Sequence, residues 1–328
     1  MDYKIIIGDC LHSMQSLPDQ SVQTCVTSPP YFGLRNYGND QQIGLEQTPD
    51  EFVNKLVDVF REVRRVLKND GTLWLNLGDS YCGVNGYARA SEKFQRKGRS
   101  DAPANNRSLS ALHKANIKTK DLIGIPWRVA FALQADGWYL RQDIIWSKPN
   151  PMPEPVKDRC TKSHEYIFLL SKSPKYYYDH EAIKEDCSES NIQDFMKRKT
   201  LNNKGKGLGT YEEARPDLAR SRADYMPSDL KRNKRSVWEV TPKPYSGAHF
   251  AVYPPELIEP CILAATKKGD TVLDPFGGSG TTAGVALKHK RKAILCELNP
   301  EYASIVDDRI KDIFPDINQY NLLDILED

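Results

Sequence analysis

Short apolar runs alternate with a segment of helical periodicity near the start of the chain. Residues 5–7 and 22–27 are mostly apolar or β-branched, which predicts short buried strands. Hydrophobic residues recur at helical spacing over residues 52–67, which predicts an amphipathic helix. Residues 69–71 (Asn-Asp-Gly) predict a turn, and residues 72–77 predict the next strand. This order of strand, helix and strand favours a parallel sheet.

The same alternation returns in the middle of the chain and again from residue 254 onward. We therefore predict one α/β fold with a mostly parallel sheet and helices on both faces. The first and last segments of the chain are expected to share that sheet. Helices are predicted at 122–133, 254–266, 281–288 and 300–313, and strands at 138–146, 166–170, 271–273 and 292–296.

Two basic stretches interrupt the predicted elements. Residues 85–120 contain nine Lys or Arg and two Asp or Glu, and residues 190–236 contain twelve and six. The first stretch contains Gly, Ser and Asn throughout, and a loop of this length inside a compact domain is usually functional or disordered. The second stretch carries the run Gly-Lys-Gly-Leu-Gly at 205–209, which favours neither a helix nor a strand. A run of positive charge has two readings, a solvated surface or a contact with nucleic acid phosphates.

Composition excludes several classes of protein. The net charge is only +2, and no apolar run approaches the roughly 20 residues of a membrane helix. The first nine residues are strand-like and acidic, which is not the pattern of a signal peptide. The seven cysteines form no CxxC pair, which argues against a disulfide framework or a structural metal. We expect a cytoplasmic protein without a metal site.

A glycine-rich turn near the end of the chain is the first candidate for chemistry. Residues 274–282 (Asp-Pro-Phe-Gly-Gly-Ser-Gly-Thr-Thr) follow a predicted strand and open a predicted helix. Glycines let the backbone approach a ligand closely, and a helix N-terminus offers free N–H groups. Glu297 ends the next strand, where an acid can accept hydrogen bonds from ribose hydroxyls. The alternative is a tight turn without a ligand. The patterns of NAD-binding proteins and of P-loops are both absent.

The second candidate follows the strand at 22–27. Ser28-Pro29-Pro30-Tyr31 places two rigid prolines beside a hydroxyl group and an aromatic ring. The Ser28 hydroxyl and the carbonyls near Pro29 would serve as acceptors, which is what an exocyclic amino group needs to be oriented. Tyr31 offers a flat face on which an extruded base could stack. The alternative is a Pro-Pro turn that ends a strand.

Together the two motifs resemble those of the DNA methyltransferases that modify N4 of cytosine or N6 of adenine. The catalytic motif comes first and the cofactor motif last, as in the permuted β group of that family. Further segments match that group at residues 8–10 (Gly-Asp-Cys), 146–151 (Trp-Ser-Lys-Pro-Asn-Pro) and 249–254 (His-Phe-Ala-Val-Tyr-Pro). Phe250 stands where the group has proline, so the local geometry there is the one open point of the match.

The resemblance implies a Rossmann-like fold that uses S-adenosyl-L-methionine, and direct transfer to nitrogen without a metal or a covalent intermediate. It implies that Ser28, Pro29, Pro30 and Tyr31 are catalytic. The cofactor contacts that it implies are Asp9, Cys10, Asp274, Pro275, Phe276, Gly277, Gly278, Ser279, Gly280, Thr281, Glu297, Leu298 and Asn299.

Three other functions compete with this interpretation, two of them enzymatic. Methylation of cytosine at carbon 5 needs a cysteine nucleophile, and Pro260-Cys261 is the only Pro-Cys pair. That pair lies in an apolar helical stretch, where a core cysteine is the better interpretation. Glutamine methyltransferases share a Pro-Pro-Tyr motif but carry the cofactor motif first. A DNA-binding relative without activity is disfavoured by the intact Ser28, Tyr31, Gly280 and Glu297.

The order of segments in the family implies that residues 1–84 and 121–185 form the catalytic half and that residues 237–328 form the cofactor half. It also implies that residues 85–120 are a basic loop that contacts DNA and that residues 186–236 recognise the target sequence. Double-stranded DNA is the expected partner, and the resemblance allows a homodimer and a cognate restriction endonuclease in a prokaryotic cell or phage. The expected DNA contacts are Arg89, Lys93, Arg96, Lys97, Arg99, Lys197, Arg198, Lys199, Arg220, Arg222, Arg232 and Arg235.

The base that is methylated is the least constrained expectation. Relatives with Ser at the first motif position tend to modify cytosine N4, whereas Asp or Asn is commoner in enzymes that modify adenine N6. Ser28 therefore favours cytosine N4, with adenine N6 as the alternative. Chemistry alone separates the two weakly, because both amino groups present two N–H donors. The sequence contains no measure of pocket size.

Overall fold

The computed structural model describes residues 2–33, 42–82, 112, 115–190, 192–193, 230–243 and 252–316. Eight strands form one sheet in the order β1-β10-β9-β2-β3-β5-β4-β8. Five of the seven strand pairings are parallel, and only β5 runs antiparallel to its neighbours β3 and β4. The strands are β1 Tyr3–Ile7, β2 Val22–Thr27, β3 Leu67–Leu77, β4 Tyr139–Ser147, β5 His164–Ser171, β8 Val237–Glu239, β9 Thr271–Asp274 and β10 Lys292–Glu297.

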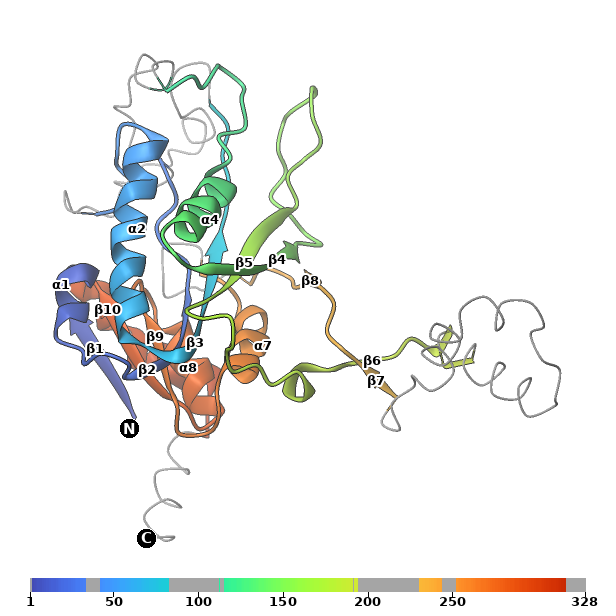
Figure 1. Ribbon diagram of the computed structural model, residues 1–328. Helices are drawn as coiled ribbons and strands as arrows, with labels where there is room; N and C mark the ends of the chain where they lie inside the picture. The colour runs from blue at the N-terminus through green and yellow to red at the C-terminus, as the bar shows by residue number, and fades with distance from the viewer. Residues whose placement is uncertain are drawn as a thin grey trace, which may run out of the picture. The chain divides into compact units, whose positions relative to one another are not determined.

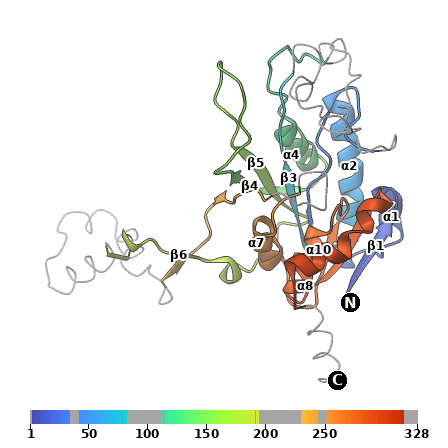
Figure 2. The same cartoon turned by 180° about the vertical axis from the view of Figure 1, so that it is seen from behind.

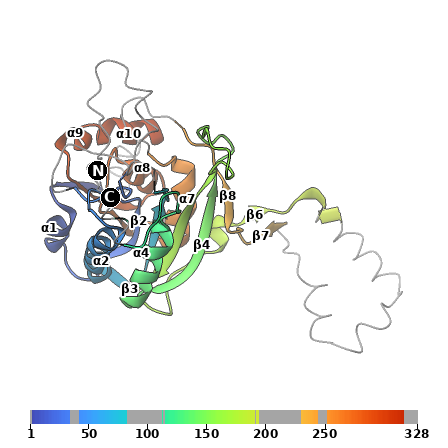
Figure 3. The same ribbon diagram turned by 90° about the horizontal axis from the view of Figure 1, so that it is seen from above.

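This sheet confirms the predicted α/β fold and the joining of the two ends of the chain. Helices α1, α2 and α4 pack together on one face of the sheet, and α7, α8 and α10 pack on the other (Figures 1 and 3). Figure 2 presents the second face, with α8 and α10 in front of the strands. The helices are α1 Cys10–Gln15, α2 Pro49–Val66, α4 Ile125–Ala135, α7 Pro255–Ala265, α8 Thr281–Lys288, α9 Pro300–Ala303 and α10 Val306–Ile313.

The long helix α2 shows how local sequence sets an element. The Thr48 hydroxyl caps its start by accepting a hydrogen bond from the amide of Glu51, and the Glu51 carboxylate accepts one from the Thr48 amide. Pro49 occupies the first helical position, where a missing N–H costs nothing. Apolar residues at helical spacing, such as Phe52 and Phe60, are fully buried against the sheet. Pattern and cap therefore agree on this helix.

Two local predictions are wrong. The turn at residues 69–71 is a bulge inside β3, because Leu67 and Thr72 both stay paired with β2 and only Gln23 lies opposite the residues between them. The helix predicted at 300–313 is two helices, α9 and α10. The Ser304 hydroxyl donates a 2.7 Å hydrogen bond to the carbonyl of Glu301 and ends the first of them.

The strand order brings loops from both ends of the chain to one edge of the sheet. In the parallel strands β1, β10, β9 and β2, the carboxyl ends point the same way, as in other open α/β sheets. Ile7 pairs with Glu297, and Leu295 pairs with Asp274, so these strand ends are level. The segments that follow the four strands include both predicted motifs. Ligands bind at this edge in doubly wound folds.

Residues 179–235 form a separate compact unit, of which only the parts near its two ends are described. Strands β6 (Glu185–Asp186) and β7 (Lys231–Arg232) pair antiparallel there. Of the predicted DNA contacts, only Arg232 and Arg235 fall within the described residues, and both pair with Glu185, at 2.9 and 2.6 Å. Burial works to raise the pKa of Glu185, but the two guanidinium groups outweigh it and lower that pKa. Within the described ranges, no helix is long and apolar enough to cross a membrane.

Candidate active site

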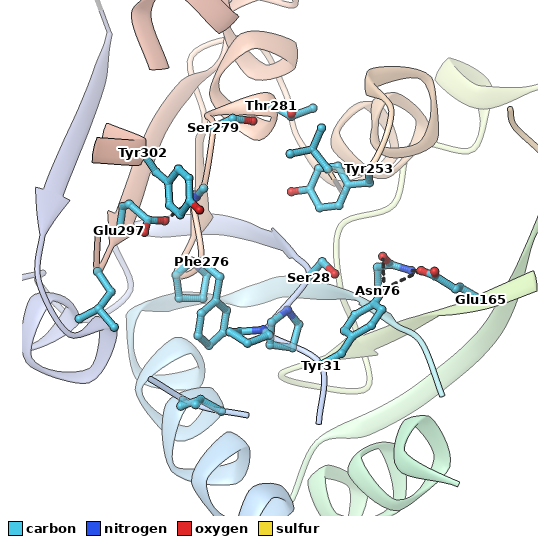
Figure 4. Close-up of a pocket in the computed structure, with 18 of the residues that line it drawn as sticks. Ser28, Tyr31, Asn76, Glu165, Tyr253, Phe276, Ser279, Thr281, Glu297 and Tyr302 are labelled. Atoms are coloured by element: carbon cyan, nitrogen blue, oxygen red, sulfur yellow. Dashed lines mark hydrogen bonds between the residues drawn. The ribbon is translucent and has the colours of Figure 1, made fainter. Parts of the chain in front are cut away.

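A cavity of about 800 Å³ lies at the carboxyl ends of the parallel strands and is lined by both predicted motifs. In the view of Figure 4, Ser28 lies between Glu297 on one side and Asn76 on the other. Of the residues predicted from sequence, those that line the cavity are Asp9, Cys10, Ser28, Pro29, Pro30, Tyr31, Pro275, Phe276, Gly277, Gly278, Ser279, Thr281, Glu297, Leu298 and Asn299.

Asp274 and Gly280 are outside this lining, and Asp274 supports it through hydrogen bonds. The Asp274 carboxylate is buried and accepts hydrogen bonds from the Thr27 hydroxyl at 2.6 Å, the Thr282 hydroxyl at 2.6 Å, the Tyr253 hydroxyl at 2.9 Å and the Phe276 amide at 3.0 Å. Burial raises the pKa of Asp274 against the effect of these four donors. Through Thr27, this carboxylate ties the end of β2 to the glycine-rich turn.

Glu297 holds the glycine-rich turn in place and keeps acceptor capacity to spare. Its Oε2 accepts the Gly278 amide at 2.7 Å, and its Oε1 accepts the Asn299 amide at 2.8 Å. Burial raises the pKa of Glu297, although the amide hydrogen bonds favour the charged form. An ionised carboxylate has about four acceptor sites, so acceptor capacity remains for a ligand beside the backbone amides that it already accepts. Vicinal hydroxyls of a ribose suit such an acceptor pair.

Ser279 gives a separate indication of a polar ligand. Its hydroxyl is buried at the cavity wall and has no hydrogen-bond partner among the described residues. A buried polar atom left without a partner costs roughly 1–3 kcal/mol, so such atoms are usually explained by something that binds. The adjacent Gly278 has a φ of +51°, and a Cβ there would meet nothing closer than 3.9 Å. The turn therefore presents one unused hydroxyl and open space beside its backbone.

The cysteines near the cavity are unsuited to nucleophilic catalysis. Burial raises the pKa of Cys10 and of Cys296 to about 12, which keeps both thiols protonated. Cys261, the cysteine of the carbon-5 alternative, is fully buried in α7 and lies outside the cavity lining. Asp9, beside Cys10, caps α1 by accepting the His12 amide at 3.1 Å and also lines the cavity.

The predicted catalytic motif places the Tyr31 ring on the side of the cavity away from Glu297, with Ser28 between the two (Figure 4). No hydrogen bond within the described part of the chain occupies the Ser28 hydroxyl. The Tyr31 hydroxyl donates to Oε2 of Glu165 at 2.6 Å and lies 3.3 Å from the amide oxygen of Asn76. The Tyr31 ring packs on Gly78, where a Cβ would come within 2.5 Å of the ring. The ring is therefore fixed by contacts at its edge and at its hydroxyl.

Sequence reasoning missed the polar group around Tyr31. Glu165 and Asn76 line the cavity, and Lys148 forms an ion pair with Glu165. The Lys148 ammonium also lies 4.2 Å from the ring centroid of Trp146. Lys148 and Trp146 belong to the segment at 146–151 that matches the resembled family, so a signal existed for them. Glu165 gave no signal, because an acid near the start of a strand is most often a surface residue.

Comparison with known proteins matches nearly the whole chain. A family model described as DNA methylase matches residues 22–308. The Type II methyltransferase M.Cfr9I of Citrobacter freundii is 48% identical over 304 residues, which are 93% of this chain and 86% of that protein. The Type II methyltransferase M.SmaI of Serratia marcescens is 46% identical over 307 residues, covering 94% of this chain and 90% of the relative.

Solved structures of similar fold cover the chain to the same extent. The PvuII DNA methyltransferase, described as cytosine-N4-specific, aligns with a TM-score of 0.59 at 20% identity over 97% of this chain and 93% of its own. A putative DNA modification methylase from Thermus thermophilus, solved with S-adenosyl-L-methionine, aligns with a TM-score of 0.56 at 22% identity over 96% and 97%. At these identities the likeness shows a shared fold.

Proposed function

The chain belongs to the DNA methylase family, and from that premise we propose that it methylates the N4 amino group of cytosine within a specific DNA sequence. The observation that carries this proposal is the single cavity lined by both Ser28 and the glycine-rich turn. A methyl donor and an acceptor base must meet in one water-excluding space for direct transfer. Methylation of adenine N6 is the alternative within the same family.

Residues on the cofactor side fit S-adenosyl-L-methionine, the methyl donor of this family. When bound, it supplies an electrophilic methyl group on a sulfonium. We assign the ribose hydroxyls to the remaining acceptor capacity of Glu297 and a polar end of the cofactor to the unpartnered hydroxyl of Ser279. Asp9 is assigned to the adenine amine on the basis of the family resemblance. Asp274 is assigned a supporting role, because its carboxylate is fully occupied.

Residues on the catalytic side orient the amino group and accept its charge. The Ser28 hydroxyl and the carbonyls beside Pro29 accept the two N–H bonds, which leaves the nitrogen lone pair facing the methyl donor. The same acceptors stabilise the positive charge that develops on nitrogen during transfer. Tyr31 offers its ring face to the base. The cysteines contribute no nucleophile, because the pKa of Cys10 and of Cys296 is raised to about 12 by burial.

The choice of cytosine rests on Ser28 as the first residue of the motif. A neutral hydroxyl at this position is typical of family members that modify cytosine N4, whereas Asp or Asn is commoner for adenine N6. We therefore keep cytosine as the target and adenine as the runner-up. A relative that binds DNA without methylating it remains the alternative of another class, and the intact Ser28, Tyr31 and Glu297 argue against it.

Recognition of DNA is assigned to the basic stretches. We propose that residues 85–120 contact phosphates and that residues 186–236 read the target sequence. Ten of the twelve contacts expected from sequence lie outside the described residues, and the remaining two, Arg232 and Arg235, are engaged with Glu185.

The bacterial relatives named as Type II methyltransferases support a cognate endonuclease and a cytoplasmic location. A homodimer is a further proposal.

The methylated nucleoside decides the proposed function. Genomic DNA from cells that express the protein would be digested to nucleosides and analysed by mass spectrometry. We expect N4-methylcytosine above the level of cells that express Ser28→Ala. N6-methyladenine alone would contradict the choice of base, and no methylated base would contradict catalysis. Sequencing that maps the methylated positions gives the recognition sequence from the same sample.

A further inference from the structure

Four prolines at alternate positions stiffen the segment that follows β4. Pro149, Pro151, Pro153 and Pro155 each fix their own φ and donate no backbone hydrogen bond. Each also disfavours the helical region for the residue before it. None of these residues belongs to a helix or a strand. The segment is therefore an extended support with few accessible conformations, standing at the rim of the cavity.

Met152 is the residue that this support presents. Its side chain is 85% exposed, and it also lines the active-site cavity. A single exposed apolar side chain is ordinary on a protein surface. Among the large exposed hydrophobic residues of the described ranges, however, only Met152 lies at the cavity. An unbranched apolar side chain thus projects from the mouth of the site toward solvent.

The rest of the β4–β5 connection braces this segment. Glu154, two residues beyond Met152, pairs with Arg159 at 2.6 Å. The Arg159 guanidinium lies 3.8 Å from the ring centroid of Tyr81, and the neighbouring Asp158 pairs with Lys120 at 2.7 Å. These contacts fasten the connection to the ends of other elements. Met152 is consequently held outward by a supported loop.

The charge of the same connection suits a nucleic acid backbone. Residues 148–163 contain four Lys or Arg and two Asp or Glu, and of these cations Lys148 and Arg159 pair with Glu165 and Glu154. Lys157 is exposed, and Lys162 is partly exposed on the same connection. Positive charge beside an apolar projection is the combination with which proteins hold phosphates while inserting a side chain between bases. Neither basic stretch discussed above includes this connection.

We propose that Met152 enters the DNA duplex at the position that the target base leaves, and that residues 148–163 are a third DNA-contacting element. This inference rests on the proposed function, because a base must leave the stack to reach the Ser28 end of the cavity. Its departure opens a gap between neighbouring base pairs. An apolar side chain fills that gap, and methionine is among the side chains used as such wedges. The alternating prolines reduce the entropy lost when Met152 is immobilised.

The test compares Met152→Ala with wild type on two duplexes that carry the mapped recognition sequence. In the first duplex the target base is paired, and in the second it faces an abasic site, so it is unpaired beforehand. On the paired duplex we expect the single-turnover methylation rate to fall roughly 10- to 30-fold. On the abasic duplex the variant should stay within roughly threefold of wild type, because little unstacking remains to be done.

Two control variants sharpen the comparison. Met152→Leu keeps an apolar side chain of similar size and should retain the wild-type rate on both duplexes. Val237→Ala removes another exposed apolar side chain, 62% exposed in β8 and outside the cavity lining, and should change neither rate. Because Met152 is exposed, its truncation leaves no core cavity, and thermal unfolding should be unchanged.

The outcomes separate the two proposals. A normal rate of Met152→Ala on the paired duplex, or an equal loss on both duplexes, would overturn the wedge. A methylated base other than cytosine would overturn the proposed function instead. The paired and unpaired duplexes are then prepared with that base as the target, and their comparison still tests whether Met152 acts as a wedge.

Discussion

The hydroxyl of Tyr31 donates a 2.6 Å hydrogen bond to Oε2 of Glu165, a residue 134 positions away in the chain. Tyr31 follows a parallel strand, whereas Glu165 lies near the start of the antiparallel strand β5. The second carboxylate oxygen of Glu165 pairs with Lys148 at the end of β4. The orientation of the ring in the catalytic motif is thus fixed by the part of the sheet that carries neither motif.

This bond predicts that Glu165 acts through Tyr31. Glu165→Gln weakens the acceptor and removes the ion pair, and Tyr31→Phe removes the donor but keeps the ring. Each should lower the single-turnover rate on DNA by roughly 5- to 30-fold, equivalent to about 1–2 kcal/mol, and leave cofactor affinity unchanged. The double variant should be little slower than Glu165→Gln alone, because both changes act on the same Tyr31–Glu165 hydrogen bond. Additive losses would show that the residues act separately.

Glu297→Ala should weaken the binding of S-adenosyl-L-methionine by about 1.5–3 kcal/mol, measured by calorimetry. Burial raises the pKa of Glu297, so acid should neutralise this carboxyl at a higher pH than an ordinary glutamate. Protonation removes acceptor capacity, so wild-type affinity should fall on acidification and approach that of the variant. Glu301→Ala is the matched control, since Glu301 is exposed and lies outside the cavity lining. Equal affinities of wild type and Glu297→Ala would remove Glu297 from the cofactor site.

Gly280→Ala should destabilise the fold more than Gly269→Ala. Both glycines have left-handed backbones, with φ of +89° and +84°, so both substitutions cost about 1–2 kcal/mol of strain. A Cβ at Gly280 would also lie 2.6 Å from Cγ1 of Val306, whereas one at Gly269 would meet nothing within 4 Å. We expect a further loss of about 1–3 kcal/mol for Gly280→Ala in urea unfolding. Combining Gly280→Ala with Val306→Ala should cost less than the sum of the two.

Glu259 should make the packing of α7 against α8 sensitive to acid. It lies 2.6 Å from His289 and 2.9 Å from Lys288, which join α7 to the end of α8. The hydrogen bond with His289, aided by Lys288, outweighs burial and lowers the pKa of Glu259 from 4.5 to about 2. A carboxyl whose pKa is lowered by folding stabilises the native state above its unfolded pKa and loses that effect as pH falls through the folded pKa.

Glu259→Gln should therefore lower the free energy of unfolding at neutral pH by about 1–2 kcal/mol, allowing for solvent screening of a pair that is partly exposed. The difference from wild type should shrink as pH falls from 4.5 to about 2. Urea unfolding across that range measures it. A difference that stayed constant with pH would mean that packing, and not charge, is the cause.

The basic stretches predict a strong dependence on salt. Replacing Arg96, Lys97 and Arg99 with serine should weaken binding to every DNA sequence. It should also reduce the slope of log affinity against log salt by about 0.9 for each phosphate that the protein no longer neutralises. Replacing Arg220 and Arg222 should alter target choice instead. A triple serine variant of the exposed Lys4, Lys268 and Lys311 removes the same amount of charge and should leave the slope unchanged.

Much of the fold could be predicted because its signals are local. The helix α2 carries its own cap and apolar stripe, and the glycine-rich turn is bounded by a strand and a helix. The order of the two motifs then implied that distant strands share a sheet. The bulge in β3 could not be predicted, because residues 69–71 satisfy turn chemistry equally well. Only the pairing of Leu67 and Thr72 with the same strand distinguishes a bulge within β3 from a turn that precedes it.

The lining of the cavity could be predicted from sequence where it comes from contiguous motifs, and not where it comes from single residues. Ser28 and Gly278 belong to contiguous motifs. Glu165 reaches the cavity because β5 runs antiparallel between β3 and β4, a register that no pattern in the sequence specifies. Asn76 was likewise placed in a strand without a role. The Asn76 amide donates a hydrogen bond to Glu165 because β3 pairs with β5, and this pairing exists only in the assembled sheet.

Because β2 lies between β9 and β3 in the sheet, it pairs with one strand that is synthesised soon after it and with another that is synthesised much later. Gly8, Asp9 and Ser28 leave the ribosome early, but one wall of their cavity comes from residues 275–302. At roughly 5–20 residues per second, the early segments wait on the order of 15–60 s for their partners. A nascent chain therefore displays the Ser28 loop long before the segments that enclose the cavity with it have been made.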